Sequence, residues 1–264
     1  MKPTSTSANV LVVLWISVFA AAPGFAVPTL QLDIVGGIYD EATETVVGPS
    51  GDVITLVALL TPKGRDDFSD LDGTYYISAA LLPPVEEPGA DLGSFTFMIE
   101  PELDSYTVDV TDDMFFGVPP LESVLEFDAK DLSKHGVFET YFSEFSFTFD
   151  EKQKAAKYNV QETPGGFDAS GTGSFYRTFT VNTSLLAEGF NLHFDLYNTD
   201  LVTEIVSFKG SSSIVDIDRD LFAPFSHDAE TNTNGKDLPE PMTLLLLGTG
   251  LTAIAVVRRR KESR

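Results

Sequence analysis

The sequence predicts an all-β fold, a single β-sandwich of the jelly-roll or immunoglobulin-like type. Apolar and polar residues alternate with a period of two through the middle of the chain, and the alternating runs are rich in β-branched and aromatic residues. Clusters of Gly, Pro, Asn and Asp separate these runs, as turns separate strands. No long run with the 3.6-residue period of a helix competes with them. About nine strands joined by such turns indicate one sandwich.

The expected strands follow one another from Thr29 onward. In chain order they are residues 29–34, 53–60, 75–82, 94–98, 106–110, 138–149, 174–181, 190–197 and 204–208. The polar stretch from Asp228 to Lys236 has the composition of a tether. The sandwich is therefore expected to span residues 27–227, followed by a polar linker over residues 228–238.

The N-terminus has the three parts of a secretory signal peptide. Lys2 supplies a positive charge, an apolar run extends from Val10 to Ala22, and small residues stand at Gly24 and Ala26. The alternative is a retained membrane anchor, but the apolar run is shorter than the roughly 20 residues that span a bilayer. We expect residues 1–26 to be a signal helix that is cleaved after Ala26.

The C-terminus predicts a short membrane span. The apolar stretch 242–257 has 16 residues and would reach about 24 Å as a helix. A basic cluster follows at Arg258, Arg259, Arg260 and Lys261, which places the C-terminus in the cytoplasm. Because proline fixes φ and removes a backbone donor, Pro239-Glu240-Pro241 is expected to form a rigid, extended strip before the span. The alternative is a plain single-span anchor with a proline-rich entrance.

Pro239-Glu240-Pro241, the short Leu- and Gly-rich span and the Arg258–Arg260 cluster together resemble the PEP-CTERM sorting signal of Gram-negative bacteria. The likeness covers residues 239–264. It implies recognition by an exosortase, a membrane-embedded protease that processes the tag. It also implies an inner-membrane intermediate, a final place at the cell surface or in the extracellular matrix, and an association with exopolysaccharide and biofilm.

Several strings between the two ends are similar to the choice-of-anchor N group of extracellular domains. They are residues 30–40, 135–142, 189–197 and 223–229. This resemblance implies an exported domain with an interchangeable C-terminal anchor, and it implies no reaction.

Charge and composition exclude several classes of function. Residues 27–238 contain 11 basic and 38 acidic residues, a formal net charge of −27, which repels nucleic acid. The chain has no cysteine, so it has neither a disulfide framework nor a thiol nucleophile. The acidic residues are expected either to keep an exported protein soluble or, in part, to hold Ca²⁺.

The sequence contains no nucleophile elbow, P-loop, dinucleotide-binding fingerprint or H-E-x-x-H motif. We therefore expect a non-enzymatic protein with no catalytic residues. The alternatives are an exported glycan-acting hydrolase with a carboxylate pair and a Ca-dependent carbohydrate-binding module. The only Trp is Trp15 in the signal peptide, so tyrosines would have to form a sugar platform. The candidates are Tyr75, Tyr76, Tyr141, Tyr158 and Tyr176.

Acidic and histidine residues provide the candidate metal ligands. Asp216, Asp218 and Asp220 have D-x-D-x-D spacing, which turns three carboxylates to one side of an extended segment and suggests Ca²⁺. The loop 67–73 is a second acidic candidate. The three histidines are scattered: His193 is expected to be a structural residue on a strand, and a metal site uniting His135 with His227 is the alternative use.

Overall fold

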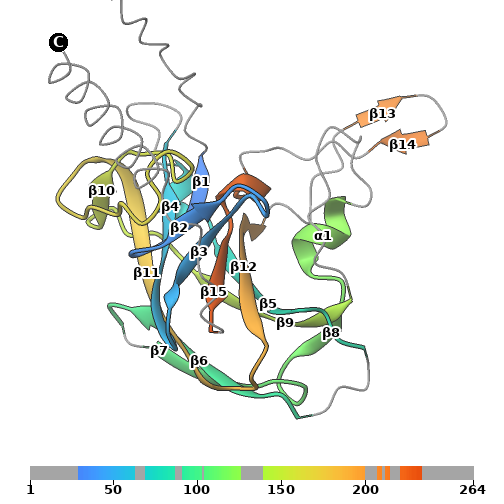
Figure 1. The fold of residues 1–264 in the computed structure, drawn as a ribbon. Coiled ribbons are helices and arrows are strands. Elements are labelled where there is room, and N and C mark those ends of the chain that lie inside the picture. The colour runs from blue at the N-terminus through green and yellow to red at the C-terminus, as the bar shows by residue number, and fades with distance from the viewer. Residues whose placement is uncertain are drawn as a thin grey trace, which may run out of the picture.

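In the computed structural model, two large β-sheets form most of the protein and pack face to face (Figure 1). The residues described are 29–62, 69–86, 91–102, 104–125, 139–199, 207–209, 212–214 and 221–233. The chain is mostly β-structure, as the alternating sequence pattern predicts. The expected signal helix at 1–26 and the expected membrane span at 242–257 both lie outside the described residues.

The first sheet has the strand order β1-β4-β11-β6-β7, and β10 pairs with β11 at one end. All of its neighbouring strands are antiparallel. The strands are β1 (Leu30–Ile34), β4 (Val53–Leu60), β6 (Gly93–Glu100), β7 (Asp104–Asp109), β10 (Lys154–Ala156) and β11 (Gly173–Leu186).

The second sheet has the strand order β2-β3-β15-β12-β5-β9-β8. Its one parallel pair within the described residues joins β3 to β15. The strands are β2 (Ile38–Asp40), β3 (Thr45–Ser50), β5 (Tyr75–Leu82), β8 (Phe115–Gly117), β9 (Thr140–Phe147), β12 (Asn191–Asn198) and β15 (Ala229–Asn232).

Short elements accompany the two sheets. They are the hairpin of β13 (Ser207–Lys209) and β14 (Ser212–Ile214), the helix α1 (Pro120–Leu125), and the 3₁₀ turns Ser69–Asp72 and Phe225–His227. In the part of the chain that the structure describes, none of the helices could cross a bilayer.

An aromatic layer joins the two sheets. Phe97 of β6 stacks on Phe145 of β9, with ring centroids 4.0 Å apart and an interplanar angle of 8°. Phe147 of β9 meets Phe179 of β11 edge to face at 5.0 Å. These pairs bring together strands from opposite sheets, so the alternating aromatic residues of the sequence are the core of the sandwich.

The tether expected from Asp228 onward is wrong for its first six residues. Ala229–Asn232 form β15, which lies between β3 and β12 inside the second sheet. Leu192 N–H donates to Thr231 Oγ1 at 2.8 Å, and the Asn191 carboxamide oxygen accepts from Thr233 N–H at 3.0 Å. The domain therefore extends at least to Thr233, because polar side chains on this strand find partners on its neighbour.

A second polar contact closes the outer face of the first sheet. The loop of residues 157–167 covers Gln31 and Asp33, which are both fully buried. Asp33 accepts hydrogen bonds from Tyr158 Oη–H at 2.5 Å and from Gly165 N–H at 2.8 Å. We call residues 157–167 the clamped loop. Gly165 has φ of +66°, and a Cβ there would lie 2.6 Å from the carbonyl oxygen of Gly37, so the close approach requires glycine.

Candidate functional site

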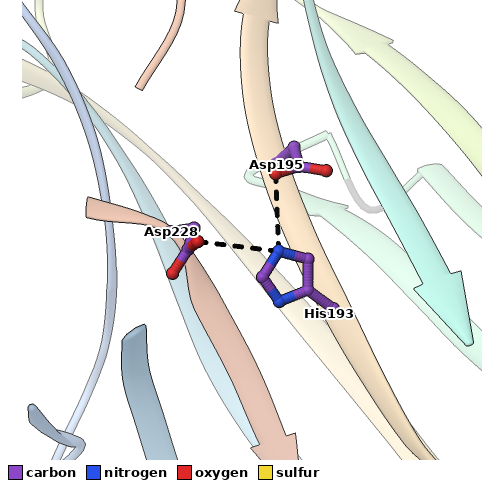
Figure 2. Close-up of side chains that lie close together, drawn as sticks. All are labelled: His193, Asp195 and Asp228. Atoms are coloured by element: carbon purple, nitrogen blue, oxygen red, sulfur yellow. Dashed lines mark ion pairs between the residues drawn. The ribbon is translucent and has the colours of Figure 1, made fainter. Parts of the chain in front are cut away.

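Three polar side chains converge on one face of the second sheet (Figure 2). His193 and Asp195 stand two residues apart on β12, so both side chains project from the same face. The antiparallel register pairs Phe194 with Ala229. Continuing that register by one residue places Asp228 opposite Asp195, which explains why residues far apart in sequence meet here.

The converging atoms form a small, closed group. His193 Nε2 lies 3.4 Å from Asp195 Oδ1 and 3.7 Å from Asp228 Oδ2. One ligating atom from each of the three residues lies within 4.8 Å of the other two. The exposed fractions of the three side chains are 2%, 1% and 1%. Two carboxyl groups and an imidazole are therefore held together out of contact with water.

This group lies on the face of β12 that points away from the aromatic layer. Leu192, Phe194 and Leu196 belong to the core between the sheets, and the alternation of a strand turns His193 and Asp195 to the other side. A small second core lies on that side, where Tyr197 packs with Leu121 and Phe222. The segment around α1 and residues 221–225 thus helps to cover a face that an ordinary sandwich leaves to solvent.

The chemistry open to this group follows from its donors. A neutral imidazole nitrogen and two carboxylate oxygens are ligands for divalent transition ions such as Zn²⁺. Ca²⁺ takes six to eight oxygen ligands, so one nitrogen and two carboxylates suit it less well. Three possible metal ligands that converge in buried positions make this group the strongest candidate site in the described residues.

His227 occupies a different environment. Its ring is buried, with Nδ1 2.8 Å from Ser226 Oγ and Nε2 3.3 Å from Asn159 Oδ1 in the clamped loop. Burial lowers the pKa of His227 to about 4, so the ring is neutral near pH 7. Since an amide oxygen only accepts hydrogen bonds, His227 Nε2 carries the proton and donates a hydrogen bond to Asn159 Oδ1. His227 Nδ1 accepts a hydrogen bond from the Ser226 hydroxyl.

A pocket of about 300 Å³ opens where β7 of the first sheet meets β8 and β9 of the second. Asp113 and Glu144 contribute carboxylates to its lining. The aromatic side chains of Tyr106 and Phe115 also line it, with exposed fractions of 45% and 69%. Tyr197 donates a hydrogen bond to Glu144 Oε1, which orients that carboxylate.

Only some of the candidate site residues predicted from the sequence are among the residues that the structure describes. Asp216, Asp218 and Asp220, together with His135, lie outside the described residues, so the Ca²⁺ site and the His135–His227 pair stay predictions. The same holds for the sorting signal at 239–264 and for cleavage at Ala26. Of the second acidic candidate, the loop 67–73, residues 69–73 are described, and Ser69–Asp72 form a 3₁₀ turn.

The tyrosines proposed as a sugar platform are mostly committed to packing. Tyr75 and Tyr141 are buried in the core, so their rings are not accessible to a sugar. Tyr76 stacks on Tyr197, and Tyr158 bonds Asp33. Tyr176 packs against Phe167 of the clamped loop. The exposed aromatic residues of the pocket, Tyr106 and Phe115, are not among these five.

His193 lies on a strand, as the alternation predicts, but the sequence did not predict that Asp195 and Asp228 lie beside it. The spacing of His193 and Asp195 is a visible signal, because residues i and i+2 of a strand share a face. The third member, Asp228, was hidden because its polar surroundings in the sequence indicated a tether.

Comparisons with protein-family models and with curated proteins give no match. Among solved structures, the chain is similar to a protein described by the phrase "AvmM Catalyzes Macrocyclization in Alchivemycin A Biosynthesis". That likeness has 10% identity and a TM-score of 0.33, and it covers 81% of this chain and 92% of the other. The collagen-binding subdomain of the Enterococcus faecalis surface protein ACE matches with 11% identity and a TM-score of 0.19, over 78% and 97% of the two chains. Both TM-scores are too low for either likeness to bear on fold type or function.

Proposed function

We propose that this chain is an exported, surface-displayed, non-enzymatic protein of the Gram-negative envelope or exopolysaccharide matrix, sorted by an exosortase. The observation that carries the proposal is the ordered tail of Pro239-Glu240-Pro241, the apolar stretch 242–257 and the Arg258–Arg260 cluster. The signal peptide at 1–26 directs the body to the outer side, and the basic cluster keeps the tail inside.

The domain boundary supports this arrangement. β15 ends at Asn232, and only residues 234–238 separate the last described residue from the Pro-Glu-Pro strip. A sheet that closes directly before the tag suits a domain delivered as a finished unit. The net charge of −27 over residues 27–238 suits a protein that stays soluble in a hydrated matrix.

Strand order supports a jelly-roll type of sandwich. The chain alternates between the sheets from β3 to β4, β4 to β5 and β5 to β6, and again from β7 to β8, β9 to β10 and β11 to β12. Repeated crossing between two mainly antiparallel sheets is typical of jelly rolls, and a simple meander would keep successive strands in one sheet.

Cell fractionation with mass spectrometry of both ends of the mature protein tests the sorting proposal. We expect a surface or matrix form that begins at Val27 and lacks Arg258–Arg260. The double variant Pro239→Ala, Pro241→Ala should accumulate in the inner membrane with the basic cluster intact. A wild-type surface protein that retains Arg258–Arg260 would refute processing at the tag.

A second candidate function, glycan binding, is favoured by the pocket between β7 and β9. Exposed aromatic faces beside carboxylates are the groups that hold sugar rings, through stacking and hydrogen bonds to hydroxyls. Carboxylates in such a pocket also suit hydrolysis when they lie about 5–10 Å apart across the scissile bond.

Titration of the chain with oligosaccharides from the exopolysaccharide of its host tests the second candidate. Tyr106→Ala and Phe115→Ala should each weaken binding at least about tenfold, the loss of roughly 1.4 kcal/mol. Leu185→Ala is the matched control, because Leu185 is 70% exposed and does not line the pocket. Equal affinities for all four chains would exclude the pocket as the glycan site, and release of shorter sugars would show hydrolysis.

A further inference from the structure

The buried group of His193, Asp195 and Asp228 is the feature that the proposed function leaves without a role. Two of its side chains come from β12 and the third from Asp228, directly before β15, and all three lie in a region closed to water. Surface acidity explains carboxylates on a convex, hydrated face. It does not explain why two carboxylates and an imidazole converge at exposed fractions of 1–2%, because carboxylates and imidazoles gathered in a buried position are the side chains that bind metal ions.

The distances within the group are those expected between ligands of one ion. Hydrogen bonds between charged nitrogen and oxygen are about 2.7–2.9 Å long, whereas His193 Nε2 lies 3.4 Å and 3.7 Å from the two carboxylate oxygens. Ligands bound at 2.0–2.1 Å to a tetrahedral ion stand about 3.3 Å from one another. The separations fit three corners of a coordination polyhedron better than they fit direct hydrogen bonds.

We propose that His193 Nε2, Asp195 and Asp228 bind one divalent transition-metal ion, for which Zn²⁺ is the best match. One imidazole nitrogen and two carboxylate oxygens are the donors that Zn²⁺ shares with Mn²⁺ and Fe²⁺, and the set is too small and too rich in nitrogen for Ca²⁺. The site uses none of the residues of the Asp216–Asp220 candidate or of the sorting tag.

The ion has a structural role in this geometry. Asp228 immediately precedes β15, and His193 and Asp195 belong to β12, so a shared ion links the last strand of the domain to its neighbour. Because the three ligands come together only in the folded sheet, the free energy of metal binding adds to the free energy of folding.

Metal binding is measured on the untagged full-length chain, purified in mild detergent, stripped with chelator and titrated with Zn²⁺. We expect one equivalent of Zn²⁺ per chain. At about 100-fold excess over Kd, the melting temperature should rise by about 5–10 °C, and a millimolar excess of Ca²⁺ should not displace the ion. Replacement by Co²⁺ should give visible absorption bands, and X-ray absorption at the zinc edge should show nitrogen and oxygen ligands including an imidazole.

Two conservative variants and one control locate the site. Asp195→Asn and His193→Gln should each lower zinc occupancy at least about tenfold and abolish the rise in melting temperature. Asp33→Asn is the matched control. Asp33 is also a fully buried carboxylate, but it lies in the first sheet and accepts hydrogen bonds from Tyr158 and Gly165 of the clamped loop. It should keep one equivalent of Zn²⁺.

The wild-type chain keeps the proposal testable if the variants do not fold. Since the chain has only three histidines, nitrogen NMR of the imidazoles distinguishes them, and only His193 should shift on zinc addition. Less than stoichiometric binding by the wild type, or a zinc-dependent shift of another histidine alone, would overturn the site. Equal zinc content in the wild type and a folded Asp195→Asn chain would overturn it as well. None of these results depends on whether the tail is processed.

Discussion

Asp33 and His227 both form hydrogen bonds with the clamped loop, and their titrations change stability in opposite directions. Burial raises the pKa of Asp33 to about 6, although its hydrogen bonds from Tyr158, Gly165 and Ile34 oppose that rise. Burial lowers the pKa of His227 to about 4. Compared with the unfolded chain, the folded protein therefore favours the neutral form of both side chains.

The sign of each contribution follows from proton linkage. Between about pH 4 and pH 6 the folded state binds a proton at Asp33 that the unfolded state releases, so this group makes stability fall as pH rises. From about pH 4 to pH 6.5 the unfolded state binds a proton at His227 that the folded state excludes, so this group makes stability rise with pH. Each shift amounts to roughly 3 kcal/mol, and the two contributions nearly cancel.

We expect each single variant to show how the remaining group makes the free energy of unfolding depend on pH. Relative to wild type, Asp33→Asn should gain stability by up to about 3 kcal/mol as pH rises from 4 to 6.5, and His227→Gln should lose a similar amount. Urea unfolding over this pH range measures both. The double variant is the control and should restore the shallow dependence of the wild type. Parallel curves for all four chains would contradict the assignment.

At the scale of single residues, sequence reasoning identified side chains but not their partners. His193 and Asp195 are recognisable as a same-face pair on an alternating strand. Their meeting with Asp228 depends on the pairing of β12 with β15, and a pairing between distant strands leaves no local trace in either segment. The roles of Asp33 and His227 were missed for the same reason, because the clamped loop that joins them contains no strand or helix signal.

At the scale of elements, the alternating runs were predicted well. The runs 53–60 and 75–82 match β4 and β5 residue for residue. β3 was missed because Gly48-Pro49 indicates a turn, and these residues lie where its pairing with β15 is irregular, a place that tolerates proline. β15 was missed because Ala-Glu-Thr-Asn carries no apolar alternation. Its Thr231 and Asn232 side chains are buried by neighbouring strands, which composition does not reveal.

The position of β15 predicts where the domain can be cut. A chain of residues 27–233 keeps the strand and should unfold cooperatively, whereas residues 27–227 lack it and should have no cooperative transition. The shorter chain loses the ladder bonds to β3 and β12 and the hydrogen bonds of Thr231 and Thr233 to β12. At about 1 kcal/mol each, these bonds approach the whole stability of a domain.

Thermal unfolding followed by circular dichroism compares the two truncated chains with one that ends at Lys236. We expect residues 27–233 and 27–236 to melt together, because the added segment lies beyond the last strand. Equal melting of residues 27–227 would show that β15 contributes nothing to the sandwich.

At the scale of the whole molecule, the two-sheet architecture could be predicted from the sequence, but the connection between body and tail could not. The prediction separated a domain from a tag by an eleven-residue linker, residues 228–238. The structure assigns the first part of that linker to the middle of a sheet. Body and proposed sorting signal are therefore close in sequence, and Asp228 of the candidate metal group lies directly before β15, the last described strand of the body.

The central place of β15 has a mechanical consequence for the proposed attachment through the C-terminal tail. Tension applied beyond Thr233 runs along β15, which is hydrogen-bonded on one side to parallel β3 and on the other to antiparallel β12. Because ladder bonds lie across the strand direction, such a pull loads them together in shear and does not open them one after another. The proposed ion, shared by Asp228 and β12, would add a second link between β15 and β12 at the N-terminal end of β15. With the proposed attachment, a pulling force would therefore meet resistance at β15 before it reaches the aromatic layer between the sheets.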